Sequence, residues 1–149
     1  MVALQILLAT IIGTILMTIF SYVVSQVEGK QFREPVLLNK LIDRWVDLSI
    51  TPHSKNPAGW ALHFFVGLLF VVVYHLIWTY TEIHATWYSA AIMGTISGLV
   101  GIGIWIVTFV IHPNPPKMHF LGFFAQLLFA HVLFGIGTWI GYMIPVWDL

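Results

Sequence analysis

The chain has 149 residues, of which 59% are hydrophobic and only 8% are charged. An average soluble domain carries about 25% charged residues, which cover its surface. This composition therefore excludes a soluble globular enzyme, a disordered chain and a nucleic-acid binder. The formal net charge is zero and cysteine is absent, so neither a charged partner nor a disulfide or thiolate site is indicated. We expect a small polytopic membrane protein whose main partner is the lipid bilayer.

Four apolar stretches are long enough to cross a bilayer as helices. A spanning helix needs about 20 residues, and backbone groups in lipid must be paired within the segment itself. The stretches cover residues 2–24, 59–80, 87–111 and 118–144, and none contains Asp, Glu, Lys or Arg. The first stretch lacks the positively charged N-terminal region of a signal peptide and is longer than its hydrophobic region, so we expect it to be a retained helix. The predicted fold is an all-α bundle of four transmembrane helices that form a single domain over residues 1–149.

The basic residues predict the orientation of this bundle. Five of the six lie between the first and second spans, and the sixth, Lys117, lies between the third and fourth. Those two loops fall on the same side of the membrane, which the positive-inside rule assigns to the cytoplasm. We therefore expect a protein of the bacterial inner membrane with both termini outside the cytoplasm.

The loop between the first two spans has a helical pattern of its own. In residues 35–50, apolar side chains recur at helical spacing and charged side chains fall on the other side. Pro35 suits a first helical turn, and Thr51-Pro52 suits an end. We predict a short amphipathic helix at the cytoplasmic membrane surface, which could instead dock a partner protein.

Small and hydroxyl-bearing residues mark faces on which these helices could pack. Close backbone approach and interhelical hydrogen bonds drive helix association in lipid. The candidate packing residues are Gly94 and Gly98 in the third span, Gly137 and Gly141 in the fourth, and Thr14 and Thr18 in the first. The stripe of Thr10, Thr14 and Thr18 could alternatively line a small-solute or ion channel, which would need an oligomer to enclose a pore.

The second and fourth spans share a pattern of residues. His63, Gly67 and Tyr74 have the same offsets as His131, Gly135 and Tyr142, and a Gly-Thr-Ile run begins at both Gly13 and Gly94. Tandem two-helix units keep the same orientation in the membrane, so the fold could consist of two helical hairpins related by an axis along the membrane normal.

One segment resembles a known group of proteins. The run GWALHFFVG at residues 59–67, followed by Phe70 and Tyr74, is similar to a signature of uncharacterised small four-helix bacterial membrane proteins of the DUF6789 and YagU-like kind. The segment from Gly13 to Thr18 and the glycine-rich third span resemble them too. This resemblance implies a four-span fold and a membrane location, and it implies no activity.

Histidine is the only residue inside the predicted spans that can act as an acid or base near neutral pH, so His63 and His131 are candidate functional residues. Two imidazoles on neighbouring helices can hold a haem b, and Gly67 and Gly135 would leave room for the macrocycle. The alternative is that each imidazole makes a hydrogen bond across a helix interface.

A separate candidate is a metal site formed by His53, His112 and His119 near the cytoplasmic face, although their spacing matches no metal motif.

No arrangement of residues predicts a catalytic centre. The spans carry no embedded carboxylate, no internal proline and no Ser-His-Asp grouping at one depth. The leading hypothesis is therefore a non-enzymatic accessory or structural component of the membrane, without a cofactor. A membrane-protein partner or a homo-oligomer remains open, with a bis-histidine haem protein and an oligomeric channel as the alternatives.

Overall fold

Four helices long and apolar enough to cross a membrane dominate the structure, a computed structural model that describes residues 1–45 and 56–145. Within these residues the chain is all-helical and contains no strand. The helices are α1 (Val2–Glu28), α2 (Glu34–Asp43), α3 (Pro57–Tyr80), α4 (Trp87–Ile111) and α5 (Phe120–Met143). The four long ones, α1, α3, α4 and α5, correspond to the four predicted spans, and α1 continues four residues beyond the predicted limit of its span.

Local sequence signals explain where the helices begin and end. Gly29 ends α1 in the left-handed conformation (φ 63°), which glycine adopts without the steric cost of a Cβ. The Asn56 side chain accepts a hydrogen bond from the backbone N–H of Ala58, and Pro57 occupies the first turn of α3. Thr86 and Ser89 form a reciprocal capping box at the start of α4. These arrangements provide hydrogen bonds for backbone groups that a helix end leaves unpaired.

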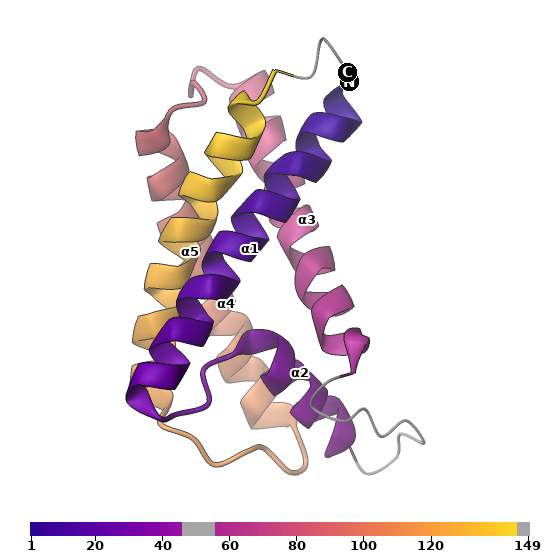
Figure 1. The fold of residues 1–149 in the computed structure, drawn as a ribbon, viewed down its shortest axis with the longest axis vertical. Coiled ribbons are helices and arrows are strands. Elements are labelled where there is room, and N and C mark those ends of the chain that lie inside the picture. Colours follow the sequence, from indigo (N-terminus) through magenta and orange to yellow (C-terminus); the bar gives the residue numbers. More distant parts are fainter. Residues whose placement is uncertain (46–55, 146–149) are drawn as a thin grey trace.

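Helix α5 lies at the centre of the packing, between α1 and α4, while α3 packs against α1 and α2 (Figure 1). The close approach of α5 to α1 depends on glycine. A Cβ added at Gly141 would lie 2.6 Å from the Cα of Ala9, closer than real Cβ atoms come to their neighbours. In contrast, α3 and α4 have little contact with each other. The most extensive packing among the described helices therefore involves the first and the last of them, α1 and α5.

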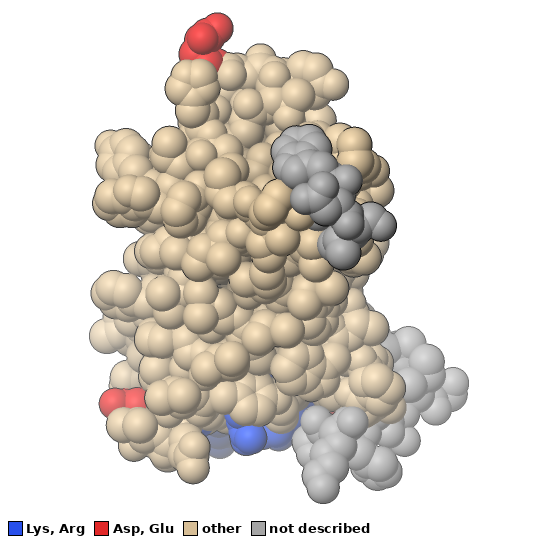
Figure 2. Space-filling view, turned by 45° about the horizontal axis from the view of Figure 1, so that its top comes forward, with Lys and Arg blue, Asp and Glu red and all other residues tan. Residues whose placement is uncertain are grey.

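The charges are divided between the two ends of the bundle. The start of α1 and the end of α5 lie together at one end (Figure 1). Blue side chains of Lys and Arg lie at the opposite end in Figure 2, and between the two ends this face has a wide band without charge. Such a band is the surface expected of helices that are surrounded by hydrocarbon.

Helix α2 lies between α1 and α3 at the basic end of the bundle (Figure 1). It ends at Asp43, earlier than the predicted limit of residue 50, and residues 46–50 lie outside the described part of the chain. Asn39 fixes α2 to the start of α3: its Oδ1 accepts from the Gly59 N–H at 2.8 Å, and its Nδ2 donates to the Asn56 carbonyl at 2.8 Å. Glu34 and Asn39 are buried along with Leu37 and Leu41, so the buried side of α2 is partly polar.

Candidate functional site

A cavity of about 420 Å³ lies among all five helices, at the end of the bundle that α2 covers. Tyr74 of α3 and Ser97 of α4 are joined by a hydrogen bond of 2.8 Å near the other end. Closer to α2 the two helices separate, and three cavity-lining side chains there remain exposed: Leu62 (39%), Val66 (37%) and Ile104 (54%). The cavity therefore opens sideways between α3 and α4, at a surface that consists of apolar side chains.

Helix α2 and the end of α4 close the cavity on the basic side of the bundle. Leu38, Leu41 and Ile42 of α2 line it, together with Trp45 and His112. The His112 Nε2–H donates to the Leu41 carbonyl at 2.8 Å, and the Trp45 ring lies edge-on to His112 with 5.2 Å between ring centroids. These contacts hold α2 against α4 across the base of the cavity.

His63 lines the cavity from α3, and its hydrogen bonds define its tautomer. The Thr18 hydroxyl donates its proton to the Thr14 carbonyl at 2.6 Å and can therefore only accept from His63. The His63 Nε2, 3.1 Å from the Thr18 Oγ1, is then the protonated nitrogen. Nδ1 is left with a lone pair that accepts no hydrogen bond from the described residues.

His131 lines the same cavity from α5 and has the opposite tautomer. Its Nδ1 donates to the Leu127 carbonyl at 2.8 Å, because a carbonyl oxygen can only accept. Nε2 therefore carries the lone pair, and it faces Gly101 of α4, where an added Cβ would lie 3.1 Å away. In the described part of the chain no donor reaches this nitrogen. The structure thus brings His63 and His131 to one cavity, each with an unpaired acceptor nitrogen.

A bis-histidine haem requires one nitrogen of each imidazole as an axial ligand. The Nε2 of His131 is unpaired, whereas the Nε2 of His63 is bonded to Thr18. A haem held by both residues would require His63 to leave Thr18 or to coordinate through Nδ1. The alternative, a hydrogen bond from each imidazole across a helix interface, holds for His63, which bonds to Thr18 of α1. His131 instead bonds to the Leu127 carbonyl of its own helix.

Glu34 is a cavity-lining residue that the sequence analysis did not select. This first residue of α2 is 1% exposed, and it lies where α1, α2 and α5 meet. Its Oε1 accepts from the Ser21 hydroxyl at 2.7 Å and from the Gln126 Nε2 at 3.1 Å. The second carboxyl oxygen, Oε2, is buried and has no hydrogen-bond partner among the residues that the structure describes. Burial raises the pKa of the Glu34 carboxyl to about 7, more than its hydrogen bonds to Ser21 and Gln126 lower it.

The two candidate metal ligands that the structure describes, His112 and His119, are engaged in other hydrogen bonds. His53 lies outside the described residues. His112 donates through Nε2 and accepts from the Asn114 N–H at Nδ1, while His119 accepts from the Gly122 N–H and thereby caps α5. Within residues 1–45 and 56–145, no three His, Cys, Asp or Glu side chains are grouped so that they could hold a metal ion.

The six candidate packing residues all lie at helix contacts. Gly94 and Gly98 of α4 face α5 near His131, whereas Gly137 and Gly141 of α5 face α1 near Gly13 and Ala9.

The threonines of the first span contact other helices too. The Thr18 hydroxyl bonds to His63, and the Thr14 hydroxyl is buried against Gly67, without a hydrogen-bond partner in the described part of the chain. The Thr10 hydroxyl donates to the Ile6 carbonyl of its own helix. The threonine stripe therefore faces the interior of the bundle, where two of its three hydroxyls are paired.

The fold and the cavity define a multi-pass α-helical membrane protein with an apolar internal site. No protein-family model matches the chain, and neither a curated protein nor a solved structure is significantly similar to it.

Proposed function

We propose that the chain is a non-catalytic protein of the bacterial inner membrane that holds one lipophilic molecule, taken sideways from the bilayer, in the cavity among its helices. The observation that carries this proposal is the cavity itself: about 420 Å³, mainly apolar, and open between α3 and α4. That volume lies within the range of about 300–1,000 Å³ typical of small-molecule sites. Such a protein would serve as an accessory component of the membrane, in agreement with the leading hypothesis from the sequence.

The polar atoms of the cavity wall indicate the head of this molecule. The His63 Nδ1 and the His131 Nε2 are both acceptors without a donor among the described residues. An unpaired polar atom in an apolar site is costly, so a ligand that supplies a donor gains affinity. We therefore propose a long-chain molecule with a hydroxyl head, such as a fatty or isoprenoid alcohol or a quinol.

The proposed topology has both termini outside the cytoplasm and α2 at the cytoplasmic surface. It is supported by the concentration of Lys and Arg at the end of the bundle opposite to the start of α1 (Figures 1 and 2). In this orientation the cavity lies in the cytoplasmic half of the bilayer. The amphipathic role of α2 is then to cover the base of the cavity, with Leu41 buried and Lys40 partly exposed.

The tandem-hairpin relationship and the family resemblance also remain proposals. Equivalent glycines support the first: Gly67 of α3 faces Thr14 of α1, and Gly135 of α5 faces Gly94 of α4. The resemblance to DUF6789 and YagU-like proteins is supported only by the shared four-span architecture. Neither proposal assigns a chemical activity.

Two valines on α3 provide a matched test of the cavity. Val66 lines the cavity, whereas Val73 lies two turns further along, is 48% exposed and is not part of the lining. The purified protein in detergent is equilibrated with hexadecanol, and bound ligand is counted by native mass spectrometry. We expect one molecule bound to the wild type and to Val73→Trp, and at least a tenfold loss in Val66→Trp. Equal binding by both variants would refute the proposed cavity ligand.

The hydroxyl head is tested with a ligand that lacks the donor. Hexadecyl methyl ether has a similar chain but no O–H group. We expect it to bind about tenfold more weakly than hexadecanol, because one hydrogen bond to a buried acceptor contributes about 1 kcal/mol or more. If the ether and the alcohol bind equally in the cavity, the cavity proposal stands and the hydroxyl head is wrong.

A further inference from the structure

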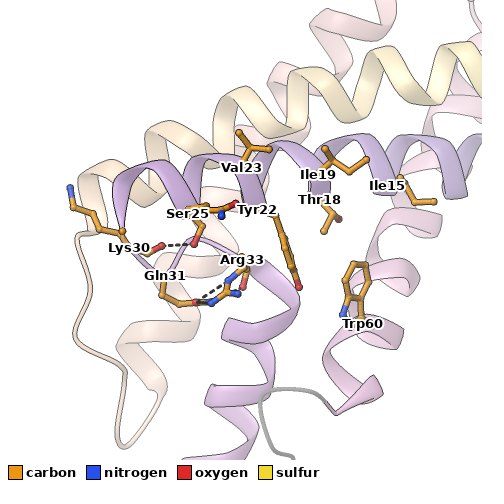
Figure 3. Close-up of a pocket in the computed structure, with 12 residues that line it drawn as sticks. Ile15, Thr18, Ile19, Tyr22, Val23, Ser25, Lys30, Gln31, Arg33 and Trp60 are labelled. Atoms are coloured by element: carbon orange, nitrogen blue, oxygen red, sulfur yellow. Dashed lines mark hydrogen bonds between the residues drawn. The ribbon is translucent and has the colours of Figure 1, made fainter.

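A second hollow, distinct from the cavity, lies on the outer side of α1. We infer that it binds an anionic phospholipid of the surrounding leaflet. The hollow has a volume of about 860 Å³ and extends along α1 from Ile15 to the turn that carries Lys30, Gln31 and Arg33 (Figure 3). Trp60 of α3 forms its other wall. We call it the α1 groove.

The polar end of the α1 groove presents a pre-oriented guanidinium group. The Arg33 Nε and Nη2 both donate to the Gln31 Oε1, at 3.2 and 2.8 Å (Figure 3). The same guanidinium lies over the Tyr22 ring, with its Cζ 5.4 Å from the ring centroid. These contacts hold the side chain in one position, so less conformational entropy is lost when a ligand binds.

This guanidinium group is not neutralised by an acid within the described residues. The ion pair found there joins Lys30 to Glu28, at 3.4 Å, and Arg33 takes part in none. Arg33 has five N–H groups, and the two bonds to Gln31 leave three of them available. Phosphate oxygens are the partners that such a fork binds best, often with two parallel hydrogen bonds.

The remainder of the α1 groove is apolar and continues toward the middle of the bundle. Ile15, Ile19 and Val23 line it and are 43%, 55% and 53% exposed. These residues span about 12 Å along the helix, since an α-helix rises about 1.5 Å per residue. A phospholipid matches this arrangement, because its phosphate would meet Arg33 while an acyl chain follows α1.

The apolar part of the α1 groove favours a lipid over free phosphate, because free phosphate has no acyl chain that could contact Ile19 and Val23. The position of the groove also favours a lipid of the cytoplasmic leaflet in the proposed topology. Basic residues near that surface attract anionic lipids. Arg33 adds directional hydrogen bonds to this general attraction.

The test compares lipids of different charge on the full-length protein. The purified chain is incubated with phosphatidylglycerol or phosphatidylcholine of the same acyl chains, and bound lipid is measured by native mass spectrometry. We expect preferential retention of phosphatidylglycerol, and a loss of about tenfold in Arg33→Gln. Lys117→Gln is the matched control, since it removes an exposed charge outside the groove. Inorganic phosphate at the same concentration should not displace the lipid.

Two further variants keep the test decisive if Arg33→Gln folds poorly. Arg33→Lys retains the positive charge but loses the planar guanidinium group. We expect its retention of phosphatidylglycerol to lie between that of the wild type and that of Arg33→Gln. Ile19→Asn leaves Arg33 in place and should weaken the binding of phosphatidylglycerol, because it removes an apolar contact with the acyl chain. Equal retention of the two lipids by the wild type, or equal losses in Arg33→Gln and Lys117→Gln, would overturn the proposal. Displacement by inorganic phosphate would also overturn it, since it would indicate a phosphate site without a lipid.

Discussion

Ser21 of α1 donates a hydrogen bond of 2.7 Å to the Oε1 of Glu34, the first residue of α2. Both residues are buried, and the Gln126 Nε2 of α5 donates to the same oxygen at 3.1 Å. Three helices therefore meet at one carboxyl group beside the cavity. Because a buried carboxylate is costly without a cation, the neutral form of Glu34 is favoured there.

The protonation of Glu34 gives the first prediction. Burial raises the pKa of its carboxyl from the ordinary value of 4.5 to about 7 in the folded protein. The folded state then binds the proton more tightly than the unfolded state, so the free energy of unfolding falls as pH rises between these two values. We expect a total loss of about 3 kcal/mol between pH 4 and pH 8. Unfolding in detergent at several pH values measures it.

Glu34→Gln serves as the control for this pH dependence. Glutamine is similar in shape to the neutral carboxyl and has no proton to lose in this range, so its stability should vary much less between pH 4 and pH 8. The variant should therefore be more stable than the wild type at pH 8. The same slope in both proteins would show that another group titrates.

The bond between Thr18 and His63 gives the second prediction. Thr18→Val keeps the shape of the side chain but leaves the His63 Nε2–H without an acceptor. We expect a loss of about 1–2 kcal/mol in the free energy of unfolding. Thr95→Val is the control, because the Thr95 hydroxyl donates to the Ala91 carbonyl of its own helix. A loss in Thr95→Val as large as that in Thr18→Val would contradict the interhelical bond.

The contact of α5 with α1 gives the third prediction. A leucine at Gly141 would collide with the backbone of Ala9, since even a Cβ would lie 2.6 Å from the Ala9 Cα. Overpacking of this kind costs about 1–3 kcal/mol, and here both backbones must move. Gly103→Leu is the control, because an added Cβ at Gly103 meets nothing within 4 Å. We expect thermal unfolding in detergent to show a lower midpoint for Gly141→Leu than for Gly103→Leu.

The fourth prediction concerns the topology. The chain has no cysteine, so a single introduced cysteine can be labelled without background. With a membrane-impermeant maleimide on intact cells, we expect Glu82→Cys to react at once. Lys117→Cys should react only after the cells are permeabilised. The reverse pattern would place the termini in the cytoplasm and the basic loops outside.

The sequence was sufficient to predict the four long helices, because lipid requires apolar segments of a definite length. The predicted third span, residues 87–111, coincides with α4, and the proline-rich stretch after His112 ends that helix. Pairing of the helices was harder to predict. Glycine patterns marked Gly94 and Gly141 as contact sites, but they did not indicate which neighbour each helix meets.

The site was only partly predictable. His63 and His131 stood out because ionisable residues are rare in membrane spans, and both line the cavity. Glu34 lies in the charged segment between the first two spans and was not selected as a candidate. Its burial depends on Gln126, which is 92 residues away in the chain, so local sequence gave no sign of it. A polar Ser21 and Gln126 within two apolar spans were the available clue to a buried polar partner.

The central claim, a lipophilic ligand that enters between α3 and α4, is tested most directly by photo-crosslinking. The probe is hexadecanol with a diazirine on its chain, added to the protein in phosphatidylcholine vesicles, and labelled residues are mapped by mass spectrometry. We predict labels concentrated at the cavity mouth, on Val66 and Ile104, that unlabelled hexadecanol displaces. Labels spread evenly over lipid-facing residues such as Leu69 and Ile96, unaffected by hexadecanol, would contradict the account.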